Sequence, residues 1–106
     1  MSTTYKDVEL ILTCESTEDA RKICQEYKIA RPFSEFYSSD NSEEDERSVI
    51  ISDFTTKTPG DFADDWITLI EGDLGIYIDT WSCDETGYSV NESLYNRYKT
   101  TGSLIN

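Results

Sequence analysis

Four short stretches have the apolar pattern of β-strands. Apolar side chains alternate with polar ones in residues 8–13 (Val-Glu-Leu-Ile-Leu-Thr) and again in residues 74–81. Residues 48–54 are apolar enough to predict a central strand of a sheet. Residues 33–37 (Phe-Ser-Glu-Phe-Tyr) predict a further short strand.

Two segments have the spacing of amphipathic helices, and each is preceded by a capping residue. Ser16 offers the N-cap of the first helix, and Arg31-Pro32 is its expected stop. Thr58 offers the second N-cap with Pro59 at the first helical position, and Gly72 is the expected stop. The expected apolar faces consist of Ala20, Ile23, Cys24 and Tyr27 in the first helix and Phe62, Trp66, Leu69 and Ile70 in the second.

The order strand, helix, strand, strand, helix, strand predicts an α+β fold. It is the βαββαβ pattern of a ferredoxin-like domain, an antiparallel sheet with two helices on one face. Residues 84–87 predict a turn, after which residues 88–90 form a hairpin partner. From Asn91 onward either a short helix begins or the strand continues. No linker or repeat is visible, so residues 1–106 are expected to form a single domain.

The charge balance excludes some ligands. The 106 residues include 22 Asp and Glu, 9 Lys and Arg and no His, for a net charge of −13. Nucleic acid and anionic membranes are therefore not expected as direct ligands, because both require a basic surface. The N-terminus lacks the basic start and apolar run of a signal peptide, so we expect a cytoplasmic protein.

Catalytic and metal-binding patterns are missing from the sequence. Without His, the commonest general base and the usual Ser or Cys nucleophile pairs are unavailable. The three cysteines are widely spaced without C-x-x-C, which predicts free thiols rather than disulfides or zinc. The acidic loop expected at 40–46 lacks the glycine of a calcium loop. We therefore expect no enzyme, no catalytic residue, no cofactor and no metal site.

The negative charge is concentrated in one region of the chain. Residues 32–96 contain 16 acids and two bases, for a net charge of −14, whereas the flanks contain six acids and seven bases. Part of this charge lies on the expected loop 40–46 and part on the expected helix after Thr58. These acids either keep exposed surfaces solvated or form an anionic surface that attracts a basic partner.

Aromatic residues in the last predicted strand suggest where a partner binds. If Ile76 and Ile78 face the helices, Tyr77 and Trp81 face the other way, with Asp79 between them. Either the C-terminal segment folds back over Trp81, or the two aromatic side chains are anchors of a protein interface.

In composition the chain resembles the small acidic inhibitors found among phage anti-defence proteins and bacterial immunity proteins, although no specific motif carries the likeness. The resemblance implies an anti-CRISPR-like inhibitor of a basic, nucleic-acid-handling protein, such as a nuclease, an interference complex or a toxin. Its carboxylates would then occupy phosphate positions or steer association. A phage-encoded inhibitor would act in the host cytoplasm.

Other functions remain open. An immunity protein or antitoxin would use the same surface against a cognate basic toxin. A ferredoxin-like metabolite-binding regulatory domain would self-associate through its sheet, so both a monomer and a homodimer are possible. A carboxylate metal enzyme is the least favoured. The residues expected to bind the partner are Glu43, Glu44, Asp45, Glu46, Asp61, Asp64, Asp65, Tyr77, Asp79 and Trp81.

Overall fold

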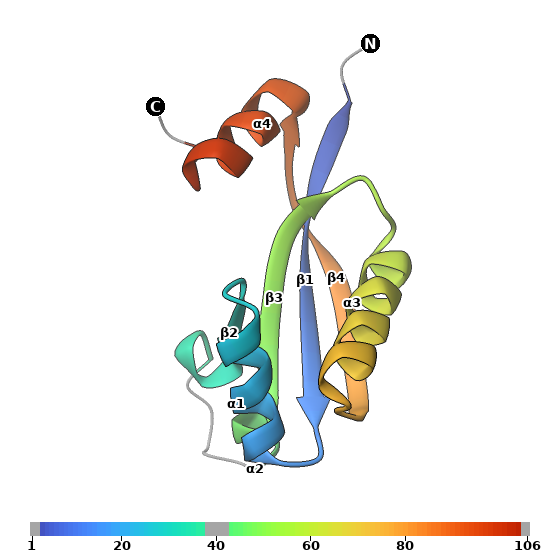
Figure 1. Cartoon of the computed structure of the whole chain (residues 1–106). Coiled ribbons are helices and arrows are strands. Elements are labelled where there is room, and N and C mark those ends of the chain that lie inside the picture. Colours follow the sequence, from blue (N-terminus) through green and yellow to red (C-terminus); the bar gives the residue numbers. More distant parts are fainter. Residues whose placement is uncertain (1–2, 38–42, 105–106) are drawn as a thin grey trace.

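The computed structural model describes residues 3–37 and 43–104, which fold into a layer of helices on an antiparallel sheet (Figure 1). The strands are β1 (Thr4–Cys14), β2 (Ala30–Pro32), β3 (Ser48–Thr55) and β4 (Ile78–Asn91). The helices are α1 (Thr17–Glu26), the 3₁₀ turn η1 (Phe33–Glu35), α2 (Glu43–Glu46), α3 (Pro59–Leu74) and α4 (Glu92–Thr101).

The four strands lie in the order β2-β3-β1-β4, and every neighbouring pair is antiparallel. β1 is a central strand, flanked by β3 and by the long edge strand β4. Helices α1 and α3 lie side by side on one face of the sheet (Figure 1). The expectation of an α+β protein with an antiparallel sheet is therefore confirmed.

The core fills the space between the sheet and these two helices. Alternate residues of β1 supply Val8, Leu10 and Leu12, which are fully buried, as the period of a strand requires. Ile23 of α1 and Ile70 of α3 pack onto them from above. Strand alternation and helical periodicity thus converge on one apolar layer, so the predicted inward faces of β1 and α1 are correct.

Both predicted helix starts are confirmed, and both predicted helix ends are wrong. The Ser16 and Thr58 hydroxyl oxygens accept hydrogen bonds from backbone N–H groups three residues later. α1 ends at Glu26, well before the proline expected to stop it. α3 continues through Gly72 and ends at Leu74. Its C-cap is Gly75, whose φ of 64° lies in the left-handed region that glycine adopts without strain.

The strand expected at residues 33–37 is not present. Residues 30–32 pair with β3 instead, and the chain then turns through η1. The rings of Phe33 and Tyr37 stack with centroids 4.8 Å apart, an i, i+4 contact that helical geometry brings together and a strand does not. The Tyr37 hydroxyl donates to Glu9 Oε1 of β1, which ties this segment to the sheet.

The turn expected at residues 84–87 is a bulge within a continuous strand. β4 runs from Ile78 to Asn91 and changes register with β1 on either side of Asp7. The Thr86 hydroxyl donates to the backbone oxygen and to Oδ2 of Asp7, and Gly87 has a φ of 93°. Beyond this strand the sequence allowed either a short helix or a continued strand. The structure has the helix α4, and the Asn91 side chain caps its start.

Candidate functional site

The acidic residues predicted to bind a partner fall into two separate groups. Asp61, Asp64 and Asp65 lie on α3, which packs against β4, the strand that contains the exposed Asp79. Glu43–Glu46 form α2, a single helical turn beside η1 near the other edge of the sheet (Figure 1). This segment was expected to be a loop; Asp40 to Ser42, the rest of that loop, lie outside the described residues. The structure therefore does not bring all ten predicted residues together.

We define the α3–β4 surface as the exposed side chains of residues 59–91. This segment contains eight acids and neither Lys nor Arg. Four of these acids have partners: Asp65 pairs with Lys57, Glu85 with Lys6 at 3.5 Å, and Glu71 and Asp73 accept hydrogen bonds from the Ile78 amide and the Tyr27 hydroxyl. Neither an ion pair nor a side-chain hydrogen bond is found among the described residues for the other four acids, which are Asp61, Asp64, Asp79 and Asp84.

Trp81 lies on this surface, but it does not face the side that the sequence pattern predicts. Trp81 pairs with Leu12, whereas Ile78 pairs with Cys14, so Asp79 is the extra residue of an irregularity. Cross-strand partners share a face of the sheet, which places Trp81 and Ile78 on the same face, toward the helices. The predicted opposition of the two residues is therefore wrong. Half of the Trp81 surface (50%) remains exposed at the edge of the sheet.

The C-terminal segment folds back without covering Trp81. Tyr95 of α4 stacks on Tyr5 with ring centroids 3.7 Å apart, and Tyr98 meets Phe54 edge to face at 5.5 Å. Tyr77 directly precedes β4, and 61% of its surface is exposed. Exposed aromatic side chains therefore accompany the unpaired acids along β4.

Two further apolar side chains of this surface escaped the sequence reasoning. Leu69 of α3 was expected on the buried face, yet it is 42% exposed because it lies at the border of the apolar stripe. Tyr88, 72% exposed, follows the β4 bulge. The signal for Tyr88 was its place beside Gly87, which marked a distortion but was interpreted as a turn.

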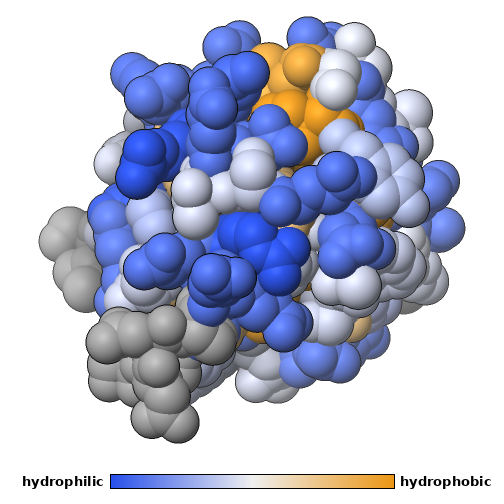
Figure 2. Space-filling view, turned by 90° about the horizontal axis from the view of Figure 1, so that it is seen from below, coloured by the Kyte–Doolittle hydropathy of each residue, from blue (hydrophilic) through white to orange (hydrophobic). Residues whose placement is uncertain are grey.

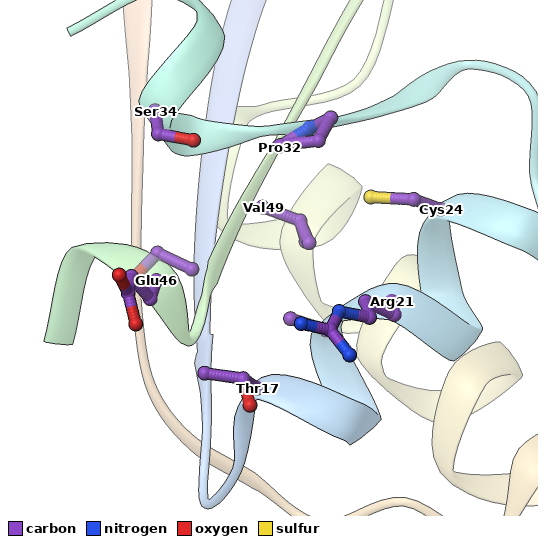
Figure 3. A pocket seen from close by; sticks show the side chains of 9 residues that line it. Thr17, Arg21, Cys24, Pro32, Ser34, Glu46 and Val49 are labelled. Atoms are coloured by element: carbon purple, nitrogen blue, oxygen red, sulfur yellow. The ribbon is translucent and has the colours of Figure 1, made fainter. Parts of the chain in front are cut away.

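A separate cavity of about 290 Å³ lies between α1, β2 and α2. Figure 3 shows Arg21 and Thr17 of α1 on one wall and Glu46 of α2 on another, with the Cys24 sulfur above Arg21 and below Pro32. Burial, together with the charge of Glu35, raises the pKa of the Cys24 thiol. A raised pKa favours the thiol over the reactive thiolate form.

Thiols and possible metal ligands are the other groups of the described residues with chemistry of their own. All three cysteines are free, and burial raises the pKa of Cys14 to about 12 and that of Cys83 to about 11. Among residues 3–37 and 43–104, no three potential ligands of the His, Cys, Asp and Glu types cluster around a common point. None of the described helices has the length and apolar character needed to cross a membrane.

The end of the molecule that carries α2 and the last turn of α3 is mostly hydrophilic, with one hydrophobic patch near its rim (Figure 2).

The chain matches no protein-family model, no curated protein and no solved structure.

Proposed function

We propose that this protein is a small acidic inhibitor that binds a basic, nucleic-acid-handling protein through its α3–β4 surface. The observation that carries the proposal is the composition of residues 59–91, in which eight acids occur without a base. Four of these acids have neither an ion pair nor a side-chain hydrogen bond among the described residues, and the same segment carries the half-exposed Trp81.

The size of the net charge favours a binding surface over mere solubility. A net charge of magnitude about 2–8 is sufficient to keep a small domain soluble, and the excess here is self-repelling. An extended patch of one sign raises association rates with an oppositely charged protein by about 10–10³-fold. Trp and Tyr are the residues that most often carry binding energy at interfaces, so Trp81 supplies an apolar anchor within the acidic surface.

The partner follows from the charge. Proteins that bind DNA or RNA carry the large basic surfaces that this protein complements. Carboxylates on the α3–β4 surface would occupy positions that phosphates take in the partner's groove, and nucleic acid and inhibitor would compete. We also propose that the fold is ferredoxin-like, which the antiparallel order β2-β3-β1-β4 and the placement of α1 and α3 on one face support.

The test is a pull-down from candidate host lysates at about 50 mM and 500 mM salt, where screening lengths differ severalfold. The expected partner binds DNA or RNA alone, loses it when this protein is added, and is released at high salt. A variant with Asp61, Asp64, Asp79 and Asp84 all changed to Asn should capture less of it. Glu43, Glu44, Asp45 and Glu46 changed to Gln is the control with equal charge removal. The proposal would be contradicted if high salt does not release the partner, or if the two variants lose capture of the partner equally.

The same surface suits an immunity protein or antitoxin, whose cognate toxin would appear in the same pull-down as a basic protein. A metabolite-binding regulatory domain is a second candidate, favoured by the cavity beside Arg21. That function predicts a small molecule that raises the melting temperature and an effect of Arg21→Gln on that shift. The α3–β4 variants should leave it unchanged.

A further inference from the structure

The two edges of the sheet are built differently. At one edge, β2 has three residues and ends in Pro32, which has no N–H to donate to a further strand. At the other edge, β4 has 14 residues, and among the described residues it pairs with β1 alone. A long free edge carries a row of N–H and C=O groups that have no partner strand.

The central part of β4 is a regular template. Residues 80–85 pair one for one with residues 8–13 of β1, and the irregularities lie outside this stretch. Six residues of strand extend about 20 Å. From the register, Trp81, Cys83 and Glu85 lie on the helix side of the sheet and Thr80, Ser82 and Asp84 on the opposite side.

We propose that the free edge of β4 at residues 80–85 accepts an extended, Lys- or Arg-containing segment of the basic partner as a fifth strand. This inference rests on the proposed function and specifies how the partner is held. Backbone hydrogen bonds would supply affinity, and alternate side chains would supply specificity. Trp81 would contact apolar residues of the added strand on one side, while Asp84 would pair with its basic residues on the other.

Charge complementarity selects this occupant over a second copy of the chain. Strand β4 contains Asp79, Asp84 and Glu85 but no Lys or Arg. No register of two β4 edges therefore places a base opposite an acid, and like charges across a strand pair are destabilising. Acids on an edge strand deter self-association and favour a basic segment.

A designed peptide tests the edge directly. The probe is acetyl-(Lys-Val)₃-amide, titrated at low salt to about 1 mM into the ¹⁵N-labelled full-length chain and followed by NMR and amide hydrogen exchange. We expect chemical-shift changes centred on residues 80–85 and slower exchange of the outward amides of this stretch. A peptide of the same sequence with every backbone nitrogen methylated keeps the charge but cannot donate ladder hydrogen bonds. It should bind at least about tenfold more weakly, because each lost hydrogen bond contributes to affinity.

Two variants with equal charge removal complete the design. Asp79→Asn/Asp84→Asn should weaken peptide binding severalfold, whereas Glu43→Gln/Glu44→Gln on α2 should change it little. Strand addition would be overturned if the methylated peptide binds as tightly as the unmethylated one, or if chemical shifts change without slower amide exchange. Either result would leave the acidic interface of the proposed function intact. No change at residues 80–85 would also overturn strand addition. Failure of the proposed function itself would appear separately, as a captured partner that nucleic acid does not displace.

Discussion

The stack of Tyr5 on Tyr95 joins the two ends of the chain, and its energy can be measured by a double-mutant cycle. The rings lie 3.7 Å apart and within 1° of parallel, a face-to-face arrangement that is less favourable than an offset one. Aromatic pairs contribute about 0.5–1.5 kcal/mol beyond area burial. We therefore expect a coupling free energy near the lower end, about 0.5–1 kcal/mol.

The single variants lose more than this coupling. Tyr95 is partly buried, so Tyr95→Ala should cost roughly half of the 3–5 kcal/mol typical of a fully buried aromatic ring. This variant also loses the cation–π contact with the Lys99 ammonium, which lies 5.5 Å from the Tyr95 ring centroid. The Lys99 contribution cancels in the cycle, because it is lost with Tyr95 whether or not Tyr5 is present.

The assay is urea unfolding of wild type, Tyr5→Ala, Tyr95→Ala and the double variant, followed by far-UV circular dichroism. Tyr88→Ala is the control: its ring is 72% exposed, so its effect should stay within about 0.5 kcal/mol. If the two single effects add to within about 0.3 kcal/mol, the stack contributes nothing measurable, and the account of how α4 docks is wrong.

Leu10→Ala should lower the free energy of unfolding by about 2–5 kcal/mol, because the fully buried side chain leaves a cavity under α1 and α3. Gly75→Ala should cost about 1–2 kcal/mol in the same urea assay, since its φ of 64° strains a residue with a Cβ. Burial raises the pKa of Asp7, so its ionised form destabilises the fold; Asp7→Asn should be more stable than wild type at neutral pH. That advantage should shrink as pH falls through the raised pKa and vanish below the ordinary value of 3.8, as urea titrations at several pH values will show. Burial raises the pKa of Cys14 to about 12 and of Cys83 to about 11, so both should react slowly with a thiol reagent at neutral pH until denaturant is added.

Local signals predicted local features well. The N-caps at Ser16 and Thr58 depend on hydrogen bonds within one helical turn, so the residue types alone located both helix starts. Glycine signals were ambiguous, because the same residue type serves different geometries. Gly72 is tolerated inside a helix at a cost of about 1 kcal/mol, whereas Gly75 ends that helix with a positive φ. Gly87 belongs to a bulge, which uses the same left-handed preference as a turn.

The candidate surface depended on longer-range information. Sequence showed where the negative charge lies along the chain, but the sheet order places α2 and α3 toward different edges. The side on which Trp81 lies was mispredicted for a related reason. One extra residue at Asp79 reverses the alternation, and it becomes visible only in the pairing with β1, more than 60 residues earlier in the chain.

The central place of β1 has a consequence for how the protein folds. This first strand needs β3 and β4 as neighbours, and the pairing of Thr4 with Asn91 joins residues from nearly opposite ends of the chain. During synthesis, Leu10 and Leu12 therefore cannot be fully covered before the segments that form β3, α3 and β4 have been made. Such non-local pairing slows folding, and the acid-rich segment that follows would help to keep the unfinished chain from aggregating.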